Sequence, residues 1–229
     1  MKKCRSRPIL LAGLCLVLAG SLVACDTSYQ NPARRTHKLL FEDDFSDPDS
    51  GWLVYSDEAC EVLYDNGEFS LLAKSISKVA SSTNTLIGRP SDFIVEADVR
   101  KLSPEKRSKG GPLFRQQNGE PSDTDGWYSF LIDVGNGRYE IGKRLDGIDS
   151  FLKKSTFSDY IWMGGNTVVN RLKVSCKGTQ IEVYVNGYIL DTVTDDSFSS
   201  GNITLTCYAG PDNNPAHYYF DNFKLYALE

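Results

Sequence analysis

Apolar and polar residues alternate one by one along several stretches of the chain, which is the pattern of strands with one buried face. In residues 93–99 the apolar Phe, Val, Ala and Val alternate with Ile, Glu and Asp, and residues 127–134 repeat the pattern. The same period runs through residues 172–176 and 181–185. No helical period of comparable length follows residue 38. The pattern predicts an all-β domain.

Turn signals separate these stretches. Asn66–Gly67, Asn136–Gly137 and Asn186–Gly187 are dipeptides of the kind that closes tight hairpins, because both residues accept a positive φ. Several strands joined by such turns are typical of a sandwich or barrel rather than of alternating strands and helices.

The N-terminus carries an export signal. A basic start is followed by an uncharged apolar run over residues 8–23, interrupted by Gly13 and Gly20. The run is shorter than the roughly 20 residues that a membrane span needs, and it matches a secretory signal. It leads into Leu22-Val-Ala-Cys25, which resembles the lipobox of bacterial lipoproteins.

The lipobox resemblance implies a signal peptide over residues 1–24 and a lipid-modified N-terminal Cys25 that carries acyl chains such as palmitate. Residues 25–38 then form a flexible tether, since they are polar and hold Pro32. The folded domain is expected over residues 39–229. We expect an extracytoplasmic location with a membrane anchor, because several acyl chains hold a protein stably on a bilayer.

The charge of the mature chain restricts its classes of partner, and its cysteine content restricts the number of disulfides. Loss of four cations with the signal peptide changes the formal charge from −5 to −9, which disfavours nucleic acid. Beyond Cys25 the mature chain keeps Cys60, Cys176 and Cys207. Three thiols allow at most one disulfide; we favour small buried side chains for all three, with the last two facing the core.

Six short segments carry a family resemblance: residues 43–52, 113–115, 139–144, 170–174, 183–187 and 220–226. In this order they resemble the concanavalin A-like lectin/glucanase jelly roll, in the branch related to family sixteen glycoside hydrolases and laminin-G-like modules. The resemblance implies a two-sheet antiparallel sandwich in which the first and last strands are neighbours. It also implies a concave sheet, which binds sugar in many relatives.

The catalytic signature of those hydrolases is absent. They carry Glu-x-Asp-x-x-Glu on one strand, whereas here Glu96 and Asp98 are followed by Lys101. If a non-standard acid pair exists, Asp133 and Glu140 are its candidates. The distance between their carboxyls decides this, since inverting hydrolysis needs carboxyls about 6.5–9.5 Å apart in an open groove. No zinc or phosphate-loop motif occurs. An enzyme is therefore the less favoured hypothesis.

A ligand-binding face follows from strand parity. If Phe114, Tyr128 and Phe130 face the core, their neighbours face outward. Aromatic, cationic and carboxylate groups together suit a polyol, through ring stacking and hydroxyl hydrogen bonds. The residues that this argument selects are Arg115, Trp127, Ser129, Asp133, Glu140 and Arg144.

Acidic loops at residues 43–49, 195–196 and 212–214 could supply oxygen ligands to calcium, although Asp and Asn are also common turn residues. We expect no cofactor. The leading hypothesis is a non-catalytic binding module for a glycan or another component of the cell envelope. A sugar-active enzyme and a structural, partner-docking lipoprotein remain the alternatives.

Overall fold

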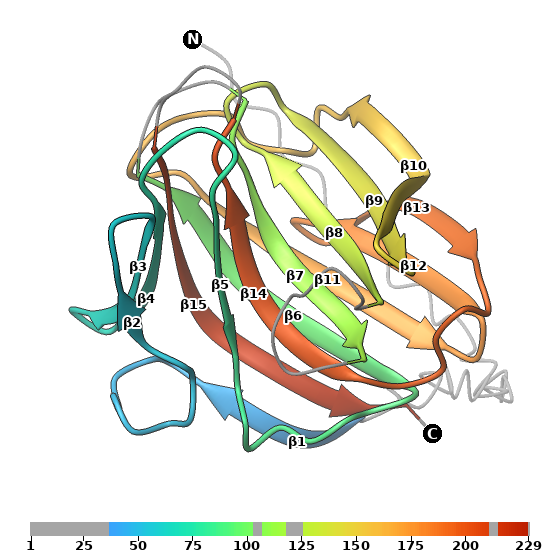
Figure 1. The fold of residues 1–229 in the computed structure, drawn as a ribbon. Coiled ribbons are helices and arrows are strands. Elements are labelled where there is room, and N and C mark those ends of the chain that lie inside the picture. Colours follow the sequence, from blue (N-terminus) through green and yellow to red (C-terminus); the bar gives the residue numbers. More distant parts are fainter. Residues whose placement is uncertain (1–36, 103–106, 118–125, 211–214, 229) are drawn as a thin grey trace, which may run out of the picture. The chain divides into compact units, whose positions relative to one another are not determined.

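A computed structural model describes residues 37–102, 107–117, 126–210 and 215–228. The predicted signal peptide, Cys25 and most of the tether lie outside these residues. Within them every regular element is a strand, and all strand pairs are antiparallel. Among the described residues no helix has the length and apolar character needed to cross a bilayer. The prediction of a two-sheet antiparallel sandwich is confirmed (Figure 1).

The larger sheet has nine strands. Eight follow one another across the sheet in the order β13 (Tyr188–Thr194), β12 (Gln180–Val185), β11 (Val169–Lys177), β6 (Phe93–Lys101), β15 (Ala216–Ala227), β4 (Glu68–Ala73), β3 (Cys60–Asp65) and β2 (Tyr55–Ser56). The ninth strand, β1 (Lys38–Asp43), also pairs with β15.

The smaller sheet has six strands. Their order is β10 (Ile148–Phe157), β9 (Arg138–Leu145), β8 (Trp127–Asp133), β7 (Lys109–Gln116), β14 (Asn202–Tyr208) and β5 (Val79–Thr83). Side chains from both sheets form one hydrophobic core between them.

The first and last strands are neighbours, as predicted. Lys38 pairs with Ala227 and Asp43 pairs with Phe223. The Asp43 carboxylate accepts the indole N–H of Trp52 at 2.9 Å, and the Trp52 ring meets the buried Phe223 ring edge-on at 5.1 Å. The acidic segment that starts the domain therefore fixes β1 against β15.

The predicted alternation places the expected residues in the core. On β6, Phe93, Val95 and Val99 are buried in it, whereas Glu96 and Asp98 are partly exposed. Strand β8 differs, because all of its residues are buried. The side chains on both faces of β8 are therefore covered by other residues, including those on the outer side of the smaller sheet.

The three described cysteines are buried free thiols. Cys176 and Cys207 lie in the core as predicted, and burial raises the pKa of each to about 12. The Cys60 thiol donates to the Val79 carbonyl at 3.2 Å. All three behave as small buried side chains, which confirms the favoured interpretation.

Candidate functional site

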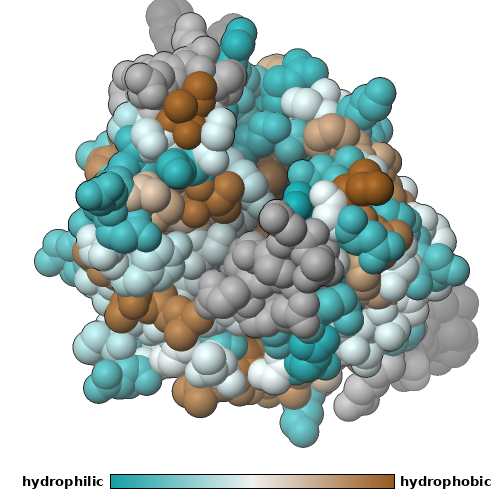
Figure 2. Space-filling view, viewed as in Figure 1, coloured by the Kyte–Doolittle hydropathy of each residue, from teal (hydrophilic) through white to brown (hydrophobic). Residues whose placement is uncertain are grey.

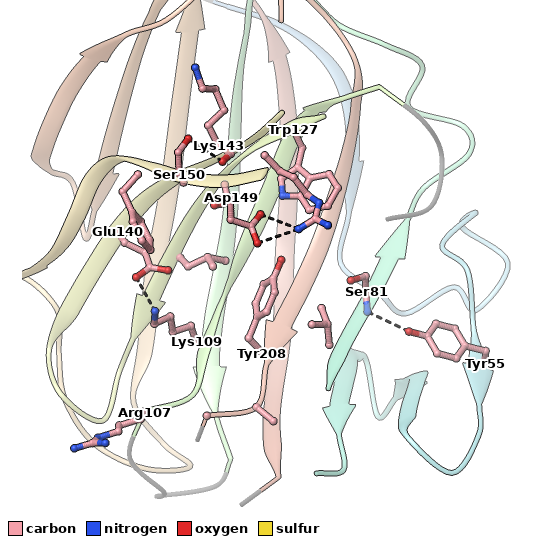
Figure 3. Close-up of a pocket in the computed structure, with 18 residues that line it drawn as sticks. Tyr55, Ser81, Arg107, Lys109, Trp127, Glu140, Lys143, Asp149, Ser150 and Tyr208 are labelled. Carbon is pink, nitrogen blue, oxygen red and sulfur yellow. Dashed lines mark hydrogen bonds and ion pairs between the residues drawn. The ribbon is translucent and has the colours of Figure 1, made fainter. Parts of the chain in front are cut away.

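A cavity of about 710 Å³ opens on the outer face of the smaller sheet. Its lining residues come from β2, β5, β7, β8, β9, β10 and β14, so it crosses every strand of that sheet (Figure 3). Figure 2 shows this side of the molecule as a mixture of hydrophilic and apolar patches. A ligand here would meet both kinds of surface.

Four of the six predicted site residues line the cavity: Trp127, Ser129, Glu140 and Arg144. Strand pairing brings them together, since Trp127 lies opposite Arg144 and Glu140 lies opposite Leu131. Parity then directs them to one face.

A glycine leaves space at the floor of the cavity. Gly142 lies opposite Ser129, and a Cβ at this position would stand 2.5 Å from the Ser129 Oγ. Any larger residue would have to displace the serine. The absence of a side chain therefore helps to create the space.

Trp127 is covered rather than open. Only 8% of it is exposed, and the Arg144 guanidinium lies 5.2 Å from its ring centroid. Arg144 in turn donates to both carboxylate oxygens of Asp149 at 3.0 and 2.9 Å, an ion pair drawn beside Trp127 in Figure 3. The predicted ring stacking on Trp127 is blocked in this arrangement, whereas Phe151 on the cavity rim is 54% exposed.

A second ion pair crosses the cavity. The Lys109 ammonium lies 2.6 Å from the Glu140 carboxylate, whose side chain is only 9% exposed. Figure 3 shows the two side chains pointing toward each other. The buried carboxylate is thus neutralised by a partner that sequence reasoning did not identify.

Asp133 does not line this cavity. It lines a separate depression of about 490 Å³, and its carboxylate accepts the side-chain amide of Asn136 at 2.7 Å. The two carboxylates proposed as a non-standard acid pair therefore do not line one cavity: Glu140 lines the larger one and Asp133 the smaller.

The prediction for Arg115 is wrong. Its side chain is 1% exposed and donates to the carbonyls of Phe198 at 3.0 Å and Ser91 at 2.7 Å, away from the cavity. The cause is a β-bulge in β7. Two residues separate Leu113 from Gln116, but only one separates their partners Thr204 and Asn202, and Arg115 has a φ of +50°. Strict parity fails at such a bulge.

The loops considered for calcium have other partners. Asp43 holds Trp52, and Asp195 accepts from the Lys143 ammonium at 2.6 Å and from the Tyr128 hydroxyl. Burial opposes ionisation of Asp195, but its hydrogen bonds outweigh burial and hold its pKa well below the usual range. Residues 212–214 lie outside the described part of the chain. No cluster of three metal-ligating side chains occurs among the described residues.

Several lining residues were missed by sequence reasoning. Lys109 shares the outward parity of β7, which was a usable signal. Asp149 and Phe151 come from β10, and Tyr55 comes from β2 of the other sheet. Their approach to the cavity depends on how distant segments pack, so the local pattern carried no signal for them.

No family model matches the sequence, and no curated protein does. Solved structures do. The carbohydrate-binding module CBM66 from Bacillus subtilis is 17% identical, with a TM-score of 0.60 over 78% of this chain and 96% of that one. A Bacillus subtilis protein of unknown function with a galectin-like fold is 10% identical, with a TM-score of 0.64 over 83% and 96%.

The Bacillus licheniformis β-glucanase is 14% identical, with a TM-score of 0.59 over 85% of this chain and 100% of that one. Similarity at these identities concerns the fold. The domain has the concanavalin A-like jelly-roll fold that family sixteen glycoside hydrolases share, as the sequence resemblance implied.

Proposed function

We propose that the chain is a membrane-tethered extracytoplasmic lipoprotein whose domain is a non-catalytic binding module for a glycan or another component of the cell envelope. The cavity on the smaller sheet carries this proposal. It combines an exposed aromatic rim at Phe151 with hydroxyl and charged groups on its floor, the mixture that suits a polyol.

The state of its carboxylates favours binding over hydrolysis. A general acid for glycosidic cleavage needs a proton to give, whereas Glu140 is held in an ion pair with Lys109. The similarity of the fold to a carbohydrate-binding module is consistent with this proposal.

The test is a glycan array with the soluble chain from residue 26, together with pull-down on isolated cell walls. Phe151→Ala should weaken ligand binding about two- to tenfold, because one aromatic contact contributes about 0.5–1.5 kcal/mol. Phe157→Ala is the matched control, since Phe157 lies on the same strand, is 49% exposed and does not line the cavity. A folded domain that binds neither glycans nor cell walls would refute the proposal.

The anchor is tested separately. Cys25→Ser should leave the full-length precursor unlipidated, and metabolic labelling with an alkyne fatty acid should mark the parent but not the variant. Labelling of both proteins, or of neither, would contradict the assignment of Cys25.

A second candidate function is docking to an envelope protein. Five apolar side chains, each about half exposed, lie on the segment where β10 leads to β11 and at the turn between β12 and β13: Phe157, Tyr160, Trp162, Met163 and Tyr188. We call them the aromatic patch. The rings of Tyr160 and Tyr188 stack at 4.2 Å. The Asn170 side chain accepts a hydrogen bond from the Trp162 N–H at 2.8 Å and donates one to the Trp162 carbonyl at 3.0 Å.

About half of four aromatic side chains amounts to on the order of 400 Å², the size of the largest apolar patch on a typical monomer, and such patches are often functional. Trp162→Ala should abolish cross-linking to such a partner and leave glycan binding unchanged. Phe151→Ala should do the reverse. Loss of both activities in either variant would exclude two separate surfaces.

A further inference from the structure

The smaller depression adjoins the proposed glycan cavity. It measures about 490 Å³, and its lining residues are Arg107, Lys109, Asp133, Asn136, Arg138 and Ser155. Arg107 and Lys109, both drawn in Figure 3, also line the main cavity. The two spaces therefore share these cations. A chain-like ligand in the main cavity could extend one substituent into the depression.

The charge of the depression contrasts with that of the protein. Three cations and one carboxylate line it, although the whole chain carries a formal charge of −5. The carboxylate is that of Asp133, whose two oxygens accept the backbone and side-chain N–H groups of Asn136 at 3.2 and 2.7 Å. Its negative charge is therefore partly dispersed over hydrogen bonds that do not involve the cations.

Arg138 is oriented in advance of any ligand. Its Nε donates to the Ser155 hydroxyl at 3.1 Å and one terminal nitrogen donates to the Ser155 carbonyl at 2.8 Å. Within the described part of the chain, the other terminal nitrogen has no hydrogen-bond partner. A guanidinium fixed on one side in this way loses little freedom when it binds an oxyanion with its remaining donors.

We propose that the depression binds an oxyanion substituent, a carboxylate or a phosphate, carried by the glycan that occupies the main cavity. This inference rests on the proposed function of that cavity. Arg138 supplies directed donors and Arg107 adds positive charge at the junction, whereas the charge of Lys109 is offset by Glu140. Charge-assisted hydrogen bonds of this kind are about twice as strong as neutral ones.

Calorimetric titration of the soluble chain from residue 26 tests the inference with matched ligands. One pair is a uronic-acid oligosaccharide and its carboxyl-reduced neutral form, and the other is a phosphorylated oligosaccharide and its dephosphorylated form. The anionic member of at least one pair should bind about tenfold more tightly. The pair that shows the preference identifies carboxylate or phosphate as the natural substituent.

Variants assign the preference to the depression. Arg138→Gln should abolish it without changing affinity for the neutral form, and Arg138→Lys should restore part of it. Lys224→Gln removes the same charge from the larger sheet, where Lys224 is 43% exposed, and should keep the full preference. The preference should also shrink as salt rises from 0.05 to about 0.5 M, because screening weakens exposed ionic contacts.

The outcomes separate the two proposals. Equal binding of the anionic and neutral forms would overturn the oxyanion site and leave the glycan cavity intact, as would a preference that survives Arg138→Gln. Absence of binding by every neutral and anionic glycan, together with no binding to isolated cell walls, would overturn the proposed function itself.

Discussion

Removal of residues 222–229 tests the pairing of the chain's first and last strands. The deletion takes away the second half of β15, which lies between β1 and β6 in the larger sheet. It also removes Phe223 and Leu225, both fully buried in the core. β1 would then lose every strand partner that it has among the described residues.

The loss can be estimated from these two side chains. Burial of one large apolar side chain contributes about 1.5–3 kcal/mol, so the pair contributes about 3–6 kcal/mol before any backbone hydrogen bond is counted. Domains of this kind are stable by only about 5–15 kcal/mol. For a domain of 150–250 residues, each kcal/mol corresponds to about 2–4 °C, so Tm should fall by roughly 6–24 °C.

Thermal melting followed by circular dichroism measures the effect on the soluble chain from residue 26. The control is the chain from residue 37, which lacks the predicted tether and should melt like its parent. The truncated domain should also aggregate on heating, since β6 and β1 would expose unpaired backbone edges. A truncated protein that melts within about 2 °C of the parent would refute the pairing and the energetic reasoning built on it.

Three further predictions concern single sites. Gly142→Ala should weaken glycan binding and lower the free energy of unfolding by about 1 kcal/mol, because the new Cβ meets the Ser129 Oγ at 2.5 Å. Urea unfolding should show that the double variant with Ser129→Ala regains the lost stability. If stability is not regained, this contact is not the cause. Burial, and secondarily the charge of Arg100, lowers the pKa of His217 in the folded protein below 6.5. As pH falls, the unfolded chain therefore binds a proton at this histidine before the folded protein does. The stability that the neutral histidine contributes above pH 6.5 is lost as pH falls below that value. Unfolding at pH 8 and pH 5 should therefore show a smaller decline in His217→Gln than in the parent, and equal declines would contradict that account. Cys176 and Cys207 should react with a thiol reagent only in denaturant, since both are fully buried; rapid labelling of the native protein would contradict their placement.

The sequence alone was enough for the fold class and for several local structures. Alternation along β6 and β8 identified their core faces, because the two-residue side-chain period is a property of every extended strand. Asn66–Gly67 and Asn186–Gly187 form the predicted turns, with positive φ at both residues of each pair. At Asn136–Gly137 only the glycine has a positive φ, so that connection follows a different geometry.

The same period was sufficient to gather Trp127, Ser129, Glu140 and Arg144 on one face, because they lie on two regular strands that pair directly. It failed for Arg115, where a bulge interrupts β7. A bulge depends on the register with the neighbouring strand β14, which lies more than 80 residues further along the chain. A local pattern holds no information about that register.

Only the tertiary structure decided what the cavity presents to a ligand. The guanidinium of Arg144 covers Trp127, Lys109 neutralises Glu140, and Phe151 arrives from the strand at the sheet edge. Each of these arrangements joins side chains whose separation in the sequence is unrelated to their distance in space. Strand periodicity determines which face a side chain occupies, whereas the packing of distant strands determines its neighbours and therefore its chemistry.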